Sequence, residues 1–223
     1  RKISQGLKND IDNPYDSSKP KILFVEGGSQ YDIYAMRSAG IDPATGKEIF
    51  IKKNGEYTFK YDENERVAVG NTNPILQGSW MNTVRYKGFS ISLATSYTFG
   101  SDYYNSTLKN KVENIDLDYN VDRRVFTDRW KQPGDHTRFL GIGTSSSSSQ
   151  YSERFVEKRN ELYISSIQVM YDFAPKAITR LGLRKLAIGF GLSDIAHIST
   201  VKFERGTDYP YCRGINLIFR PTF

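Results

Sequence analysis

The residues with the clearest potential for chemistry are four polar side chains at alternate positions, Asp116, Asp118, Asn120 and Asp122. Oxygen ligands at this spacing open the calcium loop of an EF-hand, which requires glycine directly after the third ligand, here Asn120, for its sharp turn. Val121 occupies that position instead. We therefore interpret the segment as a solvated loop turn and expect no metal site.

Other reactive residue types are few and scattered. His136 and His197 are the two histidines, and their places in the sequence do not pair them as metal ligands; each is expected to be a loop residue. Cys212 is the single cysteine, so there is neither a disulfide framework nor a thiolate metal motif. The glycines from Gly182 to Gly191 alternate along a strand-like segment and do not open a helix, as a phosphate-binding loop would. We expect no catalytic residues, no cofactor and no enzyme activity.

The composition bears on three further classes. The net charge of +6 is spread along the chain without a dense basic run, which disfavours nucleic-acid binding. No stretch approaches the roughly 20 consecutive apolar residues of a membrane helix, and the mean hydropathy is −0.54. Barrel strands are hydrophilic on average, so this hydropathy does not exclude a membrane β-barrel. The 15 Tyr and 13 Phe are consistent with the strands and aromatic girdles of such a barrel. The chain begins at Arg1 without a signal peptide, so we expect a processed product or an excised part.

The strongest structural signal is strict alternation from Phe89 to Gly100. The odd positions are mostly large and apolar, and the even positions are small or polar without charge. In a β-strand these two sets lie on opposite faces. The run is longer than the roughly 5–6 residues of a typical strand and covers the ~9–11 residues that a tilted strand needs to cross a bilayer. The pattern therefore predicts a membrane-spanning strand.

The same period predicts strands at about 77–86, 89–104, 161–173, 183–192 and 209–223. Short and long connections alternate between them: Lys87-Gly88 is a two-residue hairpin turn and 174–182 is a short link, whereas the remaining connections are long. Outer-membrane barrels combine short periplasmic turns with long extracellular loops. The sequence thus predicts an all-β chain, part of an antiparallel transmembrane β-barrel with its C-terminus in the periplasm.

The long connections contain turn sequences of their own. Glu48–Ile51 is strand-like and is flanked by the turn sequences 40–47 and 53–56, which predicts a small extracellular hairpin within 9–76. Thr144–Ser149 is interpreted as a flexible loop tip.

The last predicted strand places the aromatic residues Tyr211, Phe219 and Phe223 on one face. Ending on Phe223 resembles the C-terminal signal that outer-membrane barrels present to their assembly machinery. The alternative is a terminal strand that happens to stop on Phe, and the residues alone leave both open.

Four short motifs, in order along the chain, resemble SusC/RagA-type transporters, which are TonB-dependent receptors of Bacteroidota. They are Tyr34–Pro43, Tyr86–Phe89, Arg129–Asp135 and Glu204–Pro210. The resemblance runs through nearly the whole chain and corresponds to the C-terminal barrel region of that family.

The resemblance implies a barrel of about 22 strands filled by an N-terminal plug, with the plug domain outside this chain. It also implies a SusD-like lipoprotein partner, contact with outer-membrane lipid, and nutrient uptake, in which oligosaccharide (glycan) or peptide cargo is imported with energy relayed by TonB. Five strands cannot close such a barrel and would leave unpaired edges. We therefore expect the remaining barrel strands and the plug to come from the same protein or from another chain.

Cargo contact would come from extracellular loops, where Trp130 and Tyr119 are the candidate substrate-binding residues because aromatic faces stack on sugars. The alternative, which the neighbouring Arg129 and Pro133-Gly134 favour, is that Trp130 shapes the loop. Two other functions stay open: a non-transporting outer-membrane barrel for adhesion or structure, and a soluble carbohydrate-binding β-domain. The soluble domain predicts charged outward faces, which these strands do not carry.

Overall fold

The computed structural model describes residues 9–11, 22–115, 118, 120–143, 150–179, 182–202 and 212–223. The chain forms two compact units. The first, here called the loop unit, comprises Arg1–Asn73 and Ser101–Lys158, and the second, the sheet unit, comprises Pro74–Gly100 and Arg159–Phe223. Within the described residues, no helix is both long and apolar enough to cross a membrane.

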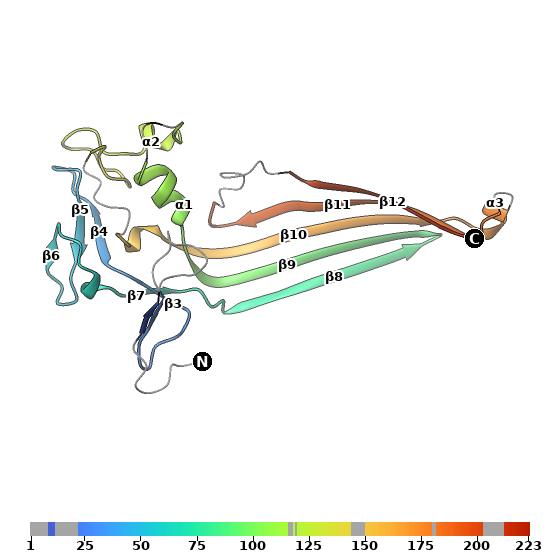
Figure 1. The fold of residues 1–223 in the computed structure, drawn as a ribbon, viewed down its shortest axis with the longest axis horizontal. Coiled ribbons are helices and arrows are strands. Elements are labelled where there is room, and N and C mark those ends of the chain that lie inside the picture. Colours follow the sequence, from blue (N-terminus) through green and yellow to red (C-terminus); the bar gives the residue numbers. More distant parts are fainter. Residues whose placement is uncertain are drawn as a thin grey trace. The chain divides into compact units, whose positions relative to one another are not determined.

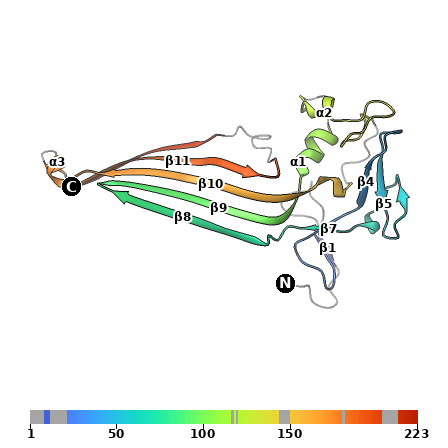
Figure 2. The same ribbon diagram turned by 180° about the vertical axis from the view of Figure 1, so that it is seen from behind.

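The sheet unit is built on five strands in the order β12-β11-β10-β9-β8, so each strand lies beside its neighbour in the chain (Figures 1 and 2). The strands are β8 (Leu76–Tyr86), β9 (Phe89–Tyr104), β10 (Val156–Asp172), β11 (Lys185–Ser199) and β12 (Gly214–Thr222). A short helix, α3 (Pro175–Ile178), lies in the connection from β10 to β11. This sheet is an antiparallel meander, and β8 and β12 form its edges.

The two-residue turn between β8 and β9 is confirmed. Lys87 and Gly88 have φ angles of 45° and 85°, and the residues on either side, Tyr86 and Phe89, are directly paired. Positive φ at both central positions is the geometry of a type I′ turn, whose twist matches that of the flanking strands.

Two strands extend beyond their expected ranges. β10 begins at Val156, where charged residues break the apolar alternation that marks 161–173. β11 runs past 192 to Ser199 through a bulge at Asp194, which has a φ of 58° and accompanies a register shift against β10. An extra residue in a strand reverses the alternation, so a two-residue period cannot be followed through it.

The last expected strand, 209–223, is described from Cys212 onward and is regular from Gly214; positions 209–211 lie outside the described residues. The assignment of 1–223 to a single barrel domain stays a prediction.

The described residues of the loop unit form three small sheets. β1 (Asn9–Ile11) pairs with β2 (Ile22–Phe24), β3 (Asp32–Ala35) pairs with β7 (Val67–Asn71), and β4 (Arg37–Ile41), β5 (Glu48–Ile51) and β6 (Tyr57–Thr58) form the third. The hairpin expected around Glu48–Ile51 is therefore present. The helical turns are η1 (Glu63–Glu65), α1 (Ser106–Leu108), η2 (Lys109–Glu113), α2 (Arg124–Thr127) and η3 (Glu153–Phe155).

An apolar core holds the loop unit together. Its buried members come from segments far apart in the sequence: Ile33, Ala35, Tyr104, Leu108, Val112, Val125, Phe139, Tyr151 and Phe155. Asn105 caps α1, because its side-chain oxygen accepts a hydrogen bond from the backbone N–H of Leu108 at 3.1 Å. The expected loop tip, Thr144–Ser149, lies outside the described residues.

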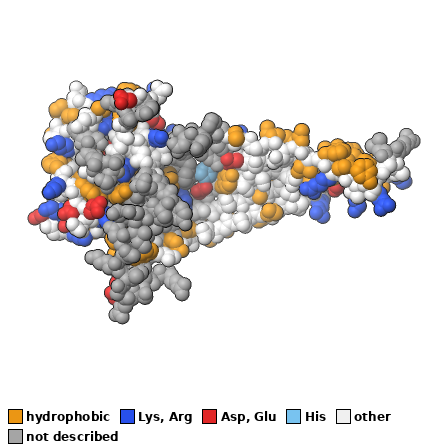
Figure 3. All heavy atoms as spheres, viewed as in Figure 1, with side chains coloured by type: hydrophobic (Ala, Val, Ile, Leu, Met, Phe, Trp, Pro, Cys, Tyr) orange, Lys and Arg blue, Asp and Glu red, His pale blue; other side chains and the backbone are white. Residues whose placement is uncertain are grey.

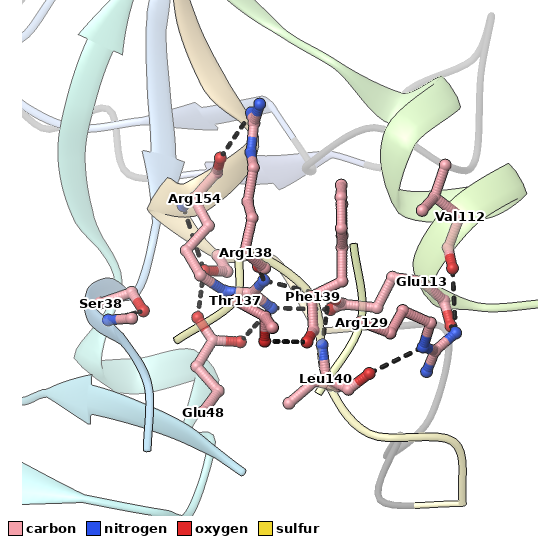
Figure 4. Close-up of polar contacts among 12 residues, drawn as sticks. Ser38, Glu48, Val112, Glu113, Arg129, Thr137, Arg138, Phe139, Leu140 and Arg154 are labelled. Atoms are coloured by element: carbon pink, nitrogen blue, oxygen red, sulfur yellow. Dashed lines mark hydrogen bonds and ion pairs between the residues drawn. The ribbon is translucent and has the colours of Figure 1, made fainter. Parts of the chain in front are cut away.

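A buried ionic network around Arg154 crosses this unit (Figure 4). Its Nη2 lies 2.7 Å from Oε2 of Glu48 and 2.7 Å from Oε1 of Glu113, and its Nη1 donates to Oε2 of Glu113 at 3.0 Å. Nη1 also donates to the carbonyl of Arg138 at 2.6 Å, and Ser152 hydrogen-bonds Glu48. β5, η2 and η3 are thereby joined through one guanidinium.

The charge on Arg154 is matched by its surroundings. Burial by itself lowers the pKa of Arg154, but the hydrogen bonds and charges of Glu48 and Glu113 outweigh burial and raise this pKa above its ordinary value. Arg154 is therefore a permanent cation that two buried carboxylates require.

We expect Arg154→Ala to destabilise the loop unit by about 3 kcal/mol or more, because removing one partner leaves two buried carboxylates without their cation. The matched control is Arg138→Ala, since the Arg138 side chain is 47% exposed and pairs with Glu157 at 2.6 Å; its loss should cost less than about 1 kcal/mol. Hydrogen exchange of β5 and η2 in the purified protein measures both. Equal losses of stability for the two substitutions would contradict a special contribution of the buried network to the stability of the loop unit.

Candidate functional site

Each strand of the sheet unit has a central segment without Asp, Glu, Lys or Arg. These segments are 76–84, 89–100, 162–171, 186–193 and 214–219. In β9 and β10 they hold 12 and 10 residues, which meets the ~9–11 that a tilted strand needs to cross a bilayer. We call the five segments together the charge-free band.

One face of this band is apolar. Val84 pairs with Ile91, and Phe190 pairs with both Val169 and Leu217. The exposed large side chains on this face are Leu76, Trp80, Val84, Tyr86, Phe89, Ile91, Phe99, Ile188, Phe190, Ile215, Leu217 and Phe219.

The opposite face is mostly small or polar, because successive side chains of a strand point to opposite sides. In the view of Figure 3 most of the surface along the middle of the sheet is neither hydrophobic nor charged. An exposed apolar face of this extent marks an interaction surface, and its band of uncharged residues suits lipid.

An aromatic row crosses the sheet at the end that holds the β8–β9 turn, here called the turn end. Tyr86 pairs with Phe89, and the rings of Phe89 and Tyr171 have centroids 4.6 Å apart. Tyr171 pairs with Ile188, which pairs with Phe219. Rings in this arrangement suit the boundary between hydrocarbon and headgroups, where one side of the ring is apolar and the other is wet.

A second pair of aromatic residues fixes the other boundary. Tyr97 and Phe99 stack with ring centroids 5.9 Å apart. From Phe89 to Phe99 the strand covers about 33 Å at ~3.3 Å per residue. At a tilt of ~40° this becomes about 25 Å across the membrane, the height of the apolar band of outer-membrane barrels.

Trp130 packs against the β4–β5 turn of the loop unit. Its indole N–H donates to the carbonyl of Pro43 at 2.8 Å, and the N–H of Gly134 donates to the same carbonyl at 2.9 Å. A Cβ atom on Gly46 would lie 2.5 Å from Cδ2 of Trp130, so the ring approaches the backbone there as only glycine allows. Two of the sequence motifs, Tyr34–Pro43 and Arg129–Asp135, are therefore in direct contact.

The neighbouring Arg129 holds the same loop from inside. Its Nε donates to the carbonyl of Leu140 at 2.7 Å, Nη1 to those of Val112 and Glu113 at 2.9 Å each, and Nη2 to that of Gly141 at 3.1 Å (Figure 4). Arg129 is only 2% exposed. Burial lowers its pKa, and the charge of Glu113 acts in the opposite direction.

Trp130 keeps some accessible surface. With Val125, Phe126, Lys131 and Ile142 it lines an open apolar cavity of about 270 Å³. Phe126 and Ile142 are 58% and 54% exposed. Both interpretations of Trp130, loop shaping and cargo contact, therefore have a structural basis, and its role in cargo contact stays a prediction.

His197 and the aromatic candidates other than Trp130 either lie outside the described ranges or belong to the sheet unit. Tyr119 and Tyr211 lie outside the described residues. Phe219 and Phe223 are 65% and 79% exposed, and their part in barrel assembly stays a prediction. His197, expected in a loop, lies instead in β11 beyond the bulge, where it contacts Glu161.

In the described part of the chain, the residue types that bind metals do not cluster. Over the described ranges, no three His, Cys, Asp or Glu side chains lie together as a metal site would require. Asp116 of the calcium-like pattern lies outside those ranges, and Cys212 is exposed.

Sequence reasoning missed Arg154, Glu48 and Glu113. One signal was available: Glu48 and Phe50 are two positions apart and therefore lie on the same side of the expected strand. In the structure both are buried. A carboxylate on a buried face needs a cation. Nothing local identifies Arg154 as that cation, because it lies more than 100 positions away.

We expect Leu93→Lys, in the middle of the apolar face, to lower the free energy of unfolding in the membrane by roughly 2–4 kcal/mol, because a cation would lie at the bilayer midplane. Ser96→Lys is the control, since Ser96 lies at similar depth on the opposite face. The yield of heat-resistant, assembled protein in outer-membrane fractions measures the effect. Equal losses for both variants would contradict a lipid-facing Leu93.

Gly46→Ala should loosen the Trp130 contact, because the new methyl group overlaps the ring and Gly46 has a φ of 69°. Gly55→Ala is the control, since Gly55 has a φ of 90° but open space around its Cα. The control isolates the backbone cost of about 1 kcal/mol, and Gly46→Ala should exceed it by at least as much again. Protease susceptibility of the Arg129–Gly141 loop is the measurement; no difference between the variants would exclude a tight contact.

No family model matches the chain. Among curated proteins, it is similar to the TonB-dependent receptor P39 of Formosa agariphila, with 25% identity over 188 residues that cover 81% of this chain and 18% of the receptor. The chain therefore spans about a fifth of that relative's length.

Among solved structures, the chain shares its fold with the RagAB peptide importer. The match to the open-open state has a TM-score of 0.68 and 18% identity, covering 91% of this chain and 22% of the other. The match to the closed-closed state has a TM-score of 0.64 and 17% identity, with the same coverage. The chain is thus similar in sequence to a segment of a TonB-dependent receptor, and it shares its fold with a segment of the RagAB importer.

Proposed function

We propose that the chain is the C-terminal part of a transmembrane barrel that imports oligosaccharide or peptide nutrients across the bacterial outer membrane, driven through TonB. The observation that carries this proposal is the charge-free band with one apolar face, bounded by aromatic residues about 25 Å apart across the membrane. A soluble β-domain would have to cover that face or carry charges on it.

The open edges of the sheet define what the rest of the barrel supplies. β8 and β12 each have one neighbour among the described strands. Unpaired strand edges are not tolerated in lipid, so both edges pair with further strands of the barrel. The proposal places the plug and the TonB contact in those further parts of the protein, and a SusD-like lipoprotein over the extracellular side.

The arrangement of connections supports an orientation. The turn end has a two-residue turn and the short link with α3, whereas the other end leads into the long segments of the loop unit. In outer-membrane barrels the long loops are extracellular and the short turns periplasmic. The turn end and Phe223 are therefore assigned to the periplasm, and Trp130 to the side from which cargo arrives. No enzymatic step is part of this function.

Uptake by cells tests the function itself. A strain that lacks the whole gene should lose uptake of labelled oligosaccharides or of labelled peptides, and whichever pool is lost identifies the cargo class. Re-expression should restore uptake in cells with TonB but not in cells without it. Restoration that is independent of TonB would contradict the proposal and favour a non-transporting or passive barrel.

Cysteine labelling tests the orientation. In a protein without other cysteines, including Cys212→Ser, Asn54→Cys in the β5–β6 turn should react with a membrane-impermeant maleimide on intact cells. Lys87→Cys in the β8–β9 turn should react only after the outer membrane is opened. Both positions are exposed, so accessibility in the folded protein is matched. The reverse pattern would invert the assigned topology.

A further inference from the structure

The two ends of the charge-free band differ in charge. At the turn end the described strand ends and connections carry one acidic residue, Asp172, and six exposed basic residues: Arg85, Lys87, Lys176, Arg184, Lys185 and Arg220. At the other end the charges are mixed, with Arg159, Lys202 and Arg213 beside Glu161 and Asp194. Figure 3 shows Lys and Arg side chains gathered toward the end of the sheet where α3 lies. Among the residues that the structure describes, the excess of cations is thus confined to one rim of the band.

Three of the six cations lie in the connections at this rim. Lys87 is in the β8–β9 turn, Lys176 is in α3, and Arg184 directly precedes β11, where its N–H donates to the carbonyl of Thr222 at 2.7 Å. We call these three the rim cations. The Nζ of Lys87 lies 5.2 Å from the ring centroid of Tyr86, a member of the aromatic row.

The other three cations lie within strands on the opposite side from the aromatic row. Arg85 pairs with Ser90 and alternates with Tyr86, while Arg220 pairs with Ala187 and alternates with Phe219. Lys185, opposite Thr222, shares the face of Arg220. These three, the inner cations, point away from the apolar face and serve as an internal control.

We propose that the rim cations bind the phosphate groups of anionic phospholipids in the leaflet at the turn end. The inference rests on the proposed function, which places this end at the periplasmic side of the membrane. The aromatic row marks the base of the headgroup layer, and the rim cations lie in the connections just beyond it, at the depth of lipid phosphates. Cations near an anionic lipid surface each strengthen binding about fivefold at moderate ionic strength.

The spread of the cations favours a lipid surface over a small free anion. They lie in separate connections along the sheet edge, whereas a free-phosphate site would draw its donors together around one point. An acidic protein partner inside the barrel would meet the inner cations, since these share the small, polar face.

The test uses the full-length protein that contains this chain, purified in detergent and titrated with phosphatidylglycerol or phosphatidylcholine of equal chain length. Native mass spectrometry counts the bound lipids. The rim variant carries Lys87→Gln, Lys176→Gln and Arg184→Gln, and the inner variant carries Arg85→Gln, Lys185→Gln and Arg220→Gln. A third variant removes equal charge from the loop unit, through Lys47→Gln, Lys60→Gln and Lys131→Gln at exposed positions.

We expect the unaltered protein to prefer phosphatidylglycerol, and the rim variant alone to lose about tenfold or more in affinity for it, with phosphatidylcholine binding unchanged. Inorganic phosphate at 10 mM should leave the preference for phosphatidylglycerol intact. If phosphate abolished that preference, a free-anion site would be indicated instead. Equal losses in all three variants, or a loss confined to the inner variant, would overturn the proposal. If the unaltered protein does not fractionate with the outer membrane, the proposed function itself fails; if it does but lacks lipid preference, only this inference fails.

Discussion

The sheet unit depends on one constraint: residues in the middle of its strands carry no charge, and large apolar side chains alternate with small ones. In lipid, backbone N–H and C=O groups find no water, so each strand must pair with its neighbours along its whole length. The type I′ turn at Lys87-Gly88 sets the β8–β9 register, and that register aligns Val84 with Ile91 and Tyr86 with Phe89. A slip of one residue would turn the apolar set to the other face.

The loop unit is ordered by other interactions than the sheet unit. Its strands and helical turns are short, so order comes from long-range contacts between them. Arg129 fixes four backbone carbonyls, and Arg154 joins two buried carboxylates from separate segments. Directional bonds of this kind define one geometry more strictly than apolar contact does, at the cost of burying charge. The loop that carries Trp130 is thereby presented in a fixed shape, as a surface that meets cargo or a partner would require.

Periodic features could be predicted from the sequence, and non-periodic ones could not. The strand from Phe89, the Lys87-Gly88 turn and the hairpin at Glu48–Ile51 follow from local patterns. The continuation of β11 could not be seen because the bulge at Asp194 reverses the alternation. The Arg154 network could not be predicted for a different reason: its members lie far apart in the sequence, belong to no periodic pattern, and meet only when the loop unit folds. Pro133-Gly134 suggested that Trp130 shapes its loop, but no local pattern predicted the packing of its ring on Gly46.

The central claim is that one face of the sheet contacts lipid, and nitroxide scanning of β9 tests it most directly. Single spin-labelled cysteines from Phe89 to Gly100, in a cysteine-free full-length protein reconstituted in lipid, report collision with oxygen, which concentrates in the bilayer, and with a water-soluble nickel complex. We expect oxygen accessibility to alternate with a period of two and to be highest at the odd positions. Uniform values, or nickel access at Ile91 and Leu93, would contradict it.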